Sequence, residues 1–219
     1  MPRFSSLLAV GIVLILATGS ARAAPPDPPV LLVVGDSLSA AYKIPVQSGW
    51  VHLLAKRLAR RGYDYEVVNA SIPGDTTAGG LARLPDELKR YDPAVVVIEL
   101  GGNDGLQGLG PAQMRENLKQ MVALAQGSGA RVLLIGVRVP PNYGPVYARR
   151  FAAAYQTVAE ARGVPLVPAL MAGVVTHPEL MQERGIHPDA EAGPKILDNV
   201  WPVLRPLLER STHDGRGES

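Results

Sequence analysis

The sequence predicts an α/β protein in which one parallel β-sheet lies between two layers of helices. Short, continuous runs of apolar, mostly β-branched residues alternate along the chain with longer segments whose apolar residues recur every three or four positions. Strands that are apolar throughout are typical of a parallel sheet covered on both faces. The length of 219 residues, with 47% hydrophobic and 19% charged residues, fits one globular domain.

Five apolar runs have the length of strands, and helical spacing marks the segments that follow them. The expected strands are residues 30–34, 66–69, 94–100, 132–137 and 164–167. The expected helices are residues 47–61, 77–90, 111–126, 145–162 and 189–208. The alternation predicts one three-layer α/β/α domain at residues 30–209, without internal repeats.

Residues 1–23 have the features of a cleavable signal peptide. Arg3 supplies an early positive charge, residues 7–19 form an apolar run, and residues 21–23 supply small side chains where a signal peptidase cuts. The apolar run is short for a bilayer span, so cleavage near Ala24 and a periplasmic or secreted protein are favoured over an uncleaved anchor.

The other segments outside the domain are short and polar or proline-rich. Residues 24–29 form a proline-rich lead-in, and residues 210–219 form a tail that is expected to be disordered. Removal of residues 1–23 takes away two arginines and no acid, so the formal net charge of +2 falls to about zero. The charge therefore gives no reason to expect a nucleic-acid partner. The chain has no cysteine, which excludes disulfides, thiolate metal sites and a cysteine nucleophile.

Polar residues follow the predicted strands at the edge where a parallel sheet binds its ligands. In such sheets, ligands bind beyond the carboxyl ends of the strands. One candidate group follows each of the first three strands, and a fourth precedes the last helix. In chain order they are Ser37, Gly74, Asn103 and His187. We therefore expect these residues to meet on one rim of the sheet.

The residue types on this rim suit acyl transfer. A serine hydroxyl such as that of Ser37 becomes a nucleophile when a neighbouring base removes its proton, although a helix N-cap explains an isolated serine better. The N–H groups of Ser37 and Gly74 and the side-chain NH₂ of Asn103 are suited to bind the oxygen that becomes negative. Turn chemistry explains either glycine-rich stretch equally well when it is taken alone.

Taken together, the residues resemble the four sequence blocks of the SGNH, or GDSL-type, hydrolases. The blocks stand in order as VVGDSLSAAY with Ser37, NASIPGDTTAGG with Gly74, ELGGNDGLQG with Asn103 and GIHP with His187. The longer strings NASIPGDTTAGGLARLP, ELGGNDGLQG and RVPPNYGPVYARRF resemble the bacterial periplasmic thioesterase I/lysophospholipase L1/arylesterase branch. The resemblance covers nearly all of residues 30–208.

This resemblance implies a flavodoxin-like fold and a serine esterase mechanism. Ser37 would attack an ester or thioester carbonyl, and His187 would take and return the proton. Ser37, Gly74 and Asn103 would form the oxyanion hole, and neither a metal nor an organic cofactor would be needed. Lysophospholipids, monoacyl esters and aryl esters are the expected substrates, because an exported enzyme meets little coenzyme A.

The position that normally orients the histidine holds Arg184. The family has an aspartate three residues before the histidine, whereas a guanidinium has no acceptor and would lower the pKa of a nearby His187. Three explanations remain: a weakened Ser–His dyad held by a backbone carbonyl, substitution by Glu183, or an inactive protein. Asp189 is within reach by sequence, but it is equally suited to cap the final helix.

Apolar residues after the third and fourth strands are expected to line a substrate groove, although ordinary loop packing explains them too. They are Leu106, Leu109, Val139 and Tyr143. A carbohydrate O-acetyl esterase is the alternative hydrolase, and a catalytically impaired periplasmic lipid-binding protein is the alternative from another class. The expected partner is a small acyl ester or lipid, bound by a monomer, and transient contact with a membrane surface is left open.

Overall fold

One parallel, five-stranded β-sheet forms the centre of the protein. The structure, a computed structural model, describes residues 27–183 and 185–209. The strands are β1 (Val30–Gly35), β2 (Glu66–Asn69), β3 (Val95–Glu99), β4 (Arg131–Ile135) and β5 (Leu166–Val167). Neighbouring strands are parallel and follow the order β2-β1-β3-β4-β5. This is the flavodoxin-like order, and the predicted fold class is confirmed.

The helices are close to the predicted segments, with three differences. They are α1 (Trp50–Arg60), α2 (Thr77–Tyr91), α3 (Gly102–Leu106), α4 (Pro111–Gly127), α5 (Pro145–Arg162) and α6 (Gly193–Leu204). The first predicted helix, 47–61, starts too early, because a 3₁₀ turn at Val46–Ser48 precedes α1. The short, glycine-containing α3 has no helical sequence pattern and was not predicted. The last predicted helix, 189–208, is too long, because 3₁₀ turns at Ala190–Ala192 and Arg205–Leu207 flank α6.

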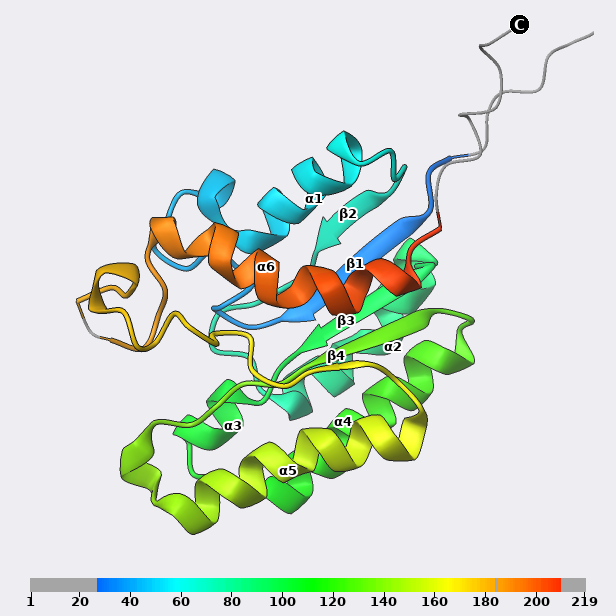
Figure 1. Ribbon diagram of the computed structural model, residues 1–219. Coiled ribbons are helices and arrows are strands. Elements are labelled where there is room, and N and C mark those ends of the chain that lie inside the picture. Colours follow the sequence, from blue (N-terminus) through cyan, green and yellow to red (C-terminus); the bar gives the residue numbers. More distant parts are fainter. Residues whose placement is uncertain (1–26, 184, 210–219) are drawn as a thin grey trace, which may run out of the picture.

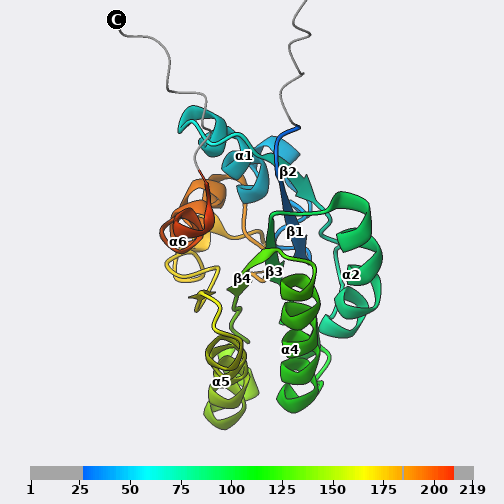
Figure 2. The same ribbon diagram turned by 90° about the vertical axis from the view of Figure 1, so that its right-hand side faces the viewer.

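Helices cover both faces of the sheet (Figures 1 and 2). The α1 and α6 helices pack together on one face, and α2, α4 and α5 pack on the other. Alternate residues of β1 therefore enter different cores: Leu31 and Val33 join the α1/α6 side, while Leu32 and Val34 join the other. Because both faces are buried, the strand is apolar at every position.

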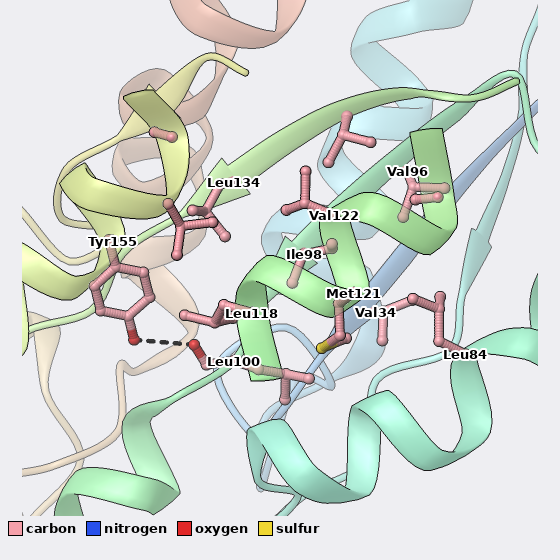
Figure 3. Close-up of a cluster of buried hydrophobic side chains, with 14 of the residues drawn as sticks. Val34, Leu84, Val96, Ile98, Leu100, Leu118, Met121, Val122, Leu134 and Tyr155 are labelled. Atoms are coloured by element: carbon pink, nitrogen blue, oxygen red, sulfur yellow. Dashed lines mark hydrogen bonds between the residues drawn. The ribbon is translucent and has the colours of Figure 1, made fainter. Parts of the chain in front are cut away.

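The core beneath α2, α4 and α5 determines the path of the chain after β3. Figure 3 shows Tyr155 of α5 beside Leu100, whose carbonyl oxygen accepts a hydrogen bond of 2.9 Å from the Tyr155 hydroxyl. The next residue, Gly101, has a φ of +119°, and a Cβ atom there would lie 2.2 Å from the Tyr155 oxygen. Only glycine fits this turn, which leads directly into α3 and its Asn103.

Several predicted features lie outside the described residues. They are the signal peptide at residues 1–23, the first part of the lead-in, Arg184 and the tail at residues 210–219. Within residues 27–183 and 185–209, no helix has both the length and the apolar character needed to cross a bilayer.

Candidate active site

Ser37 lies in a tight turn directly after β1. The backbone N–H groups of Ser39 and Ala40 donate to the carbonyl oxygen of Asp36, so the chain turns sharply away from the strand. The turn leaves the Ser37 side chain half-buried at the carboxyl edge of the sheet. The N-cap explanation for this serine is wrong, because the next long helix, α1, begins after Gly49 as its N-cap.

The described parts of the segment that carries His187, residues 181–183 and 185–188, lie at the same edge, on the side toward which the strand arrows point in Figure 1. The Gln182 N–H donates to the His187 carbonyl oxygen at 3.0 Å, which closes the loop on itself. The Gln182 side chain donates to the carbonyl oxygen of Tyr42 at 3.0 Å, which ties the loop to the turn after Ser37. As a result, His187 Nε2 lies 2.9 Å from Ser37 Oγ.

The surroundings of His187 favour its neutral form. Its ring centroid lies 4.8 Å from that of Tyr42, and the Lys43 ammonium lies 5.1 Å from the Tyr42 ring centroid. Burial lowers the pKa of His187 below its ordinary value of 6.5, and the positive charge of Lys43 lowers it further. A neutral imidazole at pH 7 can accept a proton, as a general base must.

The loops that carry Gly74 and Asn103 meet near the turn of Ser37. Gly74 has a φ of +85°, and the next residue, Asp75, accepts a 2.8 Å hydrogen bond on its carbonyl oxygen from Asn103 Nδ2. The same nitrogen lies 3.2 Å from Asp36 Oδ2. One amide thus connects the segments that follow β1, β2 and β3. The oxyanion roles assigned to Ser37, Gly74 and Asn103 stay predictions.

The group that orients His187 stays open. Glu183 is exposed, and the carboxylate of Asp189 accepts from the Ala190 N–H at 2.7 Å, so Asp189 caps the 3₁₀ turn ahead of α6. Among the residues that the structure describes, which exclude Arg184, none accepts a hydrogen bond from His187 Nδ1. These contacts favour neither Glu183 nor Asp189 as the acid.

The four predicted substrate-binding residues lie around α3 and the chain that precedes α5. Leu106 and Leu109 are 45% and 41% exposed, and Val139 is half-buried. The hydroxyl of Tyr143 donates to the Leu106 carbonyl oxygen at 3.2 Å, and that of Tyr147 donates to the Leu109 carbonyl oxygen at 3.0 Å. These two bonds hold the exposed leucines beside the start of α5. Their role in binding substrate stays a prediction.

A surface hollow lies beside these residues. Its lining includes Pro111, Tyr143, Tyr147 and Arg150. It thus contains one of the four predicted substrate-binding residues, and it does not extend to Ser37 and His187.

Two buried carboxyl groups beneath the site were not predicted. Asp36 is 2% exposed and Glu99, at the end of β3, is fully buried. Glu99 Oε2 accepts from the Ser39 hydroxyl at 2.6 Å and from the Asp36 N–H at 3.4 Å. Burial raises the pKa of Asp36 to about 6 and that of Glu99 well above its usual range. The sequence signal was the single acid inside the apolar run at residues 94–100.

Comparisons with known proteins identify the family. Residues 33–192 match the GDSL-like lipase/acylhydrolase family. The chain belongs to this family. The esterase TesA of Pseudomonas aeruginosa is 54% identical over 202 residues, which are 92% of this chain and 98% of that protein.

Further relatives agree with this assignment. The thioesterase 1/protease 1/lysophospholipase L1 of Escherichia coli strain K12 is 42% identical over 191 residues, which are 87% of this chain and 89% of that protein. A crystal structure of TesA superimposes with a TM-score of 0.81 at 56% identity, covering 82% of this chain and 99% of that one. The predicted family and the predicted class of ester and thioester hydrolase are confirmed.

Proposed function

We propose that the protein hydrolyses acyl esters and thioesters through an acyl-enzyme on Ser37, with His187 as the general base. The observation that carries the proposal is the 2.9 Å contact between Ser37 Oγ and His187 Nε2, two residues 150 positions apart in the chain. A nucleophile and its base need this hydrogen-bonding distance. Membership of an acylhydrolase family supports the type of bond that is cleaved.

The reaction has two halves. Ser37 Oγ attacks the carbonyl carbon while His187 Nε2 takes the hydroxyl proton, and the carbonyl oxygen becomes negative. The N–H groups of Ser37 and Gly74 and the Asn103 side chain bind that oxygen. The imidazolium then gives its proton to the leaving alcohol or thiol, and the acyl-enzyme remains. Water that His187 deprotonates attacks this ester, the acid leaves, and Ser37 regains its proton.

The exposed apolar side chains beside α3 are suited to bind the acyl chain of the substrate. Leu106 and Leu109 are exposed beside Tyr143 and Val139, and each Å² of apolar surface that they bury contributes about 25 cal/mol. The names of the relatives, an esterase and a thioesterase/lysophospholipase, support lysophospholipids, other acyl esters and thioesters as substrates.

The sequence pattern of the N-terminus supports an exported enzyme. Residues 1–23 direct export and are removed, and residues 30–209 form the catalytic domain of a periplasmic or secreted monomer. Such an enzyme meets lysophospholipids at a membrane surface and contacts that surface transiently.

Labelling with a fluorophosphonate ester tests the nucleophile. We expect one covalent adduct per chain, located on Ser37 by peptide mass spectrometry, because the reaction needs an activated hydroxyl. An unlabelled or randomly labelled protein would contradict the proposal and favour a lipid-binding protein. A series of p-nitrophenyl esters of increasing acyl length then tests the substrate, since a carbohydrate O-acetyl esterase would accept only the acetyl ester.

The pH profile of kcat/KM is expected to reflect the lowered pKa of His187. The base must be neutral, so activity rises with pH through this pKa, and its half-maximum lies below 6.5. Lys43→Gln removes a positive charge, which raises the pKa of His187 and moves the acidic limb to higher pH. The two profiles should converge in 1 M salt, which screens exposed charges to about 3 Å.

Lys56→Gln is the matched control for this measurement, because Lys56 is an exposed lysine of α1. It should leave the acidic limb in place. An unmoved limb in Lys43→Gln as well would show that the charge of Lys43 does not act on the base.

A further inference from the structure

The carboxylate of Asp36 lies buried beside the proposed oxyanion donor, and the mechanism above gives it no role. Its two oxygens have different partners: Oδ1 accepts from the Leu38 N–H at 3.0 Å, and Oδ2 accepts from Asn103 Nδ2 at 3.2 Å. Gly102 leaves room for the carboxylate, because a Cβ atom at that position would crowd Oδ2 at 3.1 Å. The carboxylate therefore connects the turn of the nucleophile with the donor residue.

Two acceptors determine which end of the Asn103 amide, the NH₂ group or the oxygen, points toward the turn of Ser37. The carbonyl oxygen of Asp75 accepts from Nδ2 at 2.8 Å, and Asp36 Oδ2 accepts from the same nitrogen at 3.2 Å. A rotation of the amide by 180° would bring its oxygen against these two oxygens, neither of which has a hydrogen to offer while Asp36 is ionised. The pair of acceptors thus selects the NH₂ end over the oxygen.

Asp36 can serve as an acceptor because, of the two neighbouring carboxyl groups, Asp36 is the one that is favoured to be ionised and Glu99 the one that is favoured to be protonated. Glu99 is fully buried, and burial together with the charge of Asp36 raises its pKa well above the usual range, which favours its neutral form. Burial raises the pKa of Asp36 to about 6, with smaller contributions from the charges of Asp75 and Asp104, so Asp36 is ionised at pH 8. Two neighbouring buried carboxyl groups commonly hold a single charge in this way.

We propose that Asp36 is a positioning residue for ester hydrolysis, which holds the Asn103 amide with its NH₂ group toward the developing oxyanion. The inference rests on the proposed function of Ser37 and His187. The contact with Asp36 is the longer of the two, so its hydrogen can be shared with the oxyanion while Asp75 retains the nitrogen. Asp36 acts through Asn103 and does not itself touch the substrate.

A double-mutant cycle tests this coupling with a p-nitrophenyl ester at pH 8. Asp36→Asn leaves one acceptor oxygen for two donors, and the shorter bond from the Leu38 N–H retains that oxygen. The introduced NH₂ then faces the NH₂ of Asn103, so the amide loses its orientation. We expect kcat to fall about 10²-fold with KM unchanged, as for the loss of one oxyanion donor. In an Asn103→Ala background, the same change should lower kcat less than about threefold, because the coupled group is already absent.

Either of two kinetic results would overturn the proposal. One is a double variant whose loss equals the product of the two single losses, and the other is an Asp36→Asn variant with kcat within about threefold of wild type. Asp64→Asn is the matched control, since it makes the same chemical change at an exposed position between α1 and β2.

A spectroscopic readout separates this inference from the proposed function. The side-chain amide resonances of Asn103, assigned in ¹⁵N spectra by their loss in Asn103→Ala, should shift in Asp36→Asn. Unchanged resonances would overturn the inference even in a protein without turnover, whereas a wild type that neither labels nor hydrolyses esters counts against the proposed function alone. If Asp36→Asn does not fold, Asp36→Ser removes the same carboxylate acceptor with a smaller side chain, and unchanged kcat and Asn103 resonances there would overturn the inference.

Discussion

Ser37→Ala is expected to lower kcat for p-nitrophenyl ester hydrolysis about 10⁶-fold, as for a nucleophile that works as a unit with its base. The variant lacks the oxygen that lies 2.9 Å from His187 Nε2, so no acyl-enzyme forms. The oxyanion donors and the substrate contacts remain, and they should leave activity about 10³ to 10⁴-fold above the rate in water. Burst kinetics measure the formation of the acyl-enzyme, and steady-state turnover measures the loss in kcat and the residual rate. Both are compared at equal protein concentration.

The fold should tolerate this change, because Ser37 is half-buried in a turn held by backbone hydrogen bonds. Ser128→Ala is the matched control: its hydroxyl donates to the Ala125 carbonyl oxygen at the end of α4, ahead of β4 and far from the carboxyl edge of the sheet. That variant should retain wild-type kcat. If Ser37→Ala also retained it, another residue would be the nucleophile.

Much of the fold could be predicted because both faces of the sheet are covered. Burial on both faces makes β1 apolar throughout and β3 and β4 apolar except at one end, at Glu99 and Arg131, and such runs are easily found in a sequence. The short α3 could not be predicted, because its course depends on Gly101 and on the contact between Tyr155 and Leu100. That contact joins residues 55 positions apart, and no local pattern contains it.

The sequence predicted those site residues whose type suits acyl transfer and whose place in the chain brings them to the carboxyl edge of the sheet. The carboxyl edge of a parallel sheet collects the segments that follow its strands, so the meeting of Ser37 and His187 followed from their places in the chain. Asp36 precedes a serine in a turn, where acids are common, and its partner Asn103 is 67 residues away. Such long-range hydrogen bonds between polar groups leave no periodic pattern, which is why the contact of Asp36 with Asn103 became visible only in the structure.

Arg184→Asp is expected to raise kcat by up to about 10⁴-fold, the loss seen elsewhere when the orienting aspartate is replaced. A carboxylate three residues before His187 can accept the Nδ1 proton, which leaves the lone pair of Nε2 directed at Ser37 and stabilises the imidazolium. The pKa of His187 should rise as well, because an anion replaces a cation. The acidic limb of kcat/KM should therefore move to higher pH while kcat increases.

Two further variants separate the explanations for an enzyme with arginine at this position. Arg184→Ala removes the cation without adding an acceptor, so a gain as large as that of Arg184→Asp would assign the effect to charge alone. Glu183→Gln should change kcat little, because Glu183 is exposed, and a large loss would instead identify Glu183 as the substitute acid. Arg60→Asp, the same change at an exposed residue of α1, should leave kcat unaltered. If Arg184→Asp folds and brings no gain while Glu183→Gln is silent, a backbone carbonyl already orients the imidazole, and the enzyme works as a Ser–His dyad.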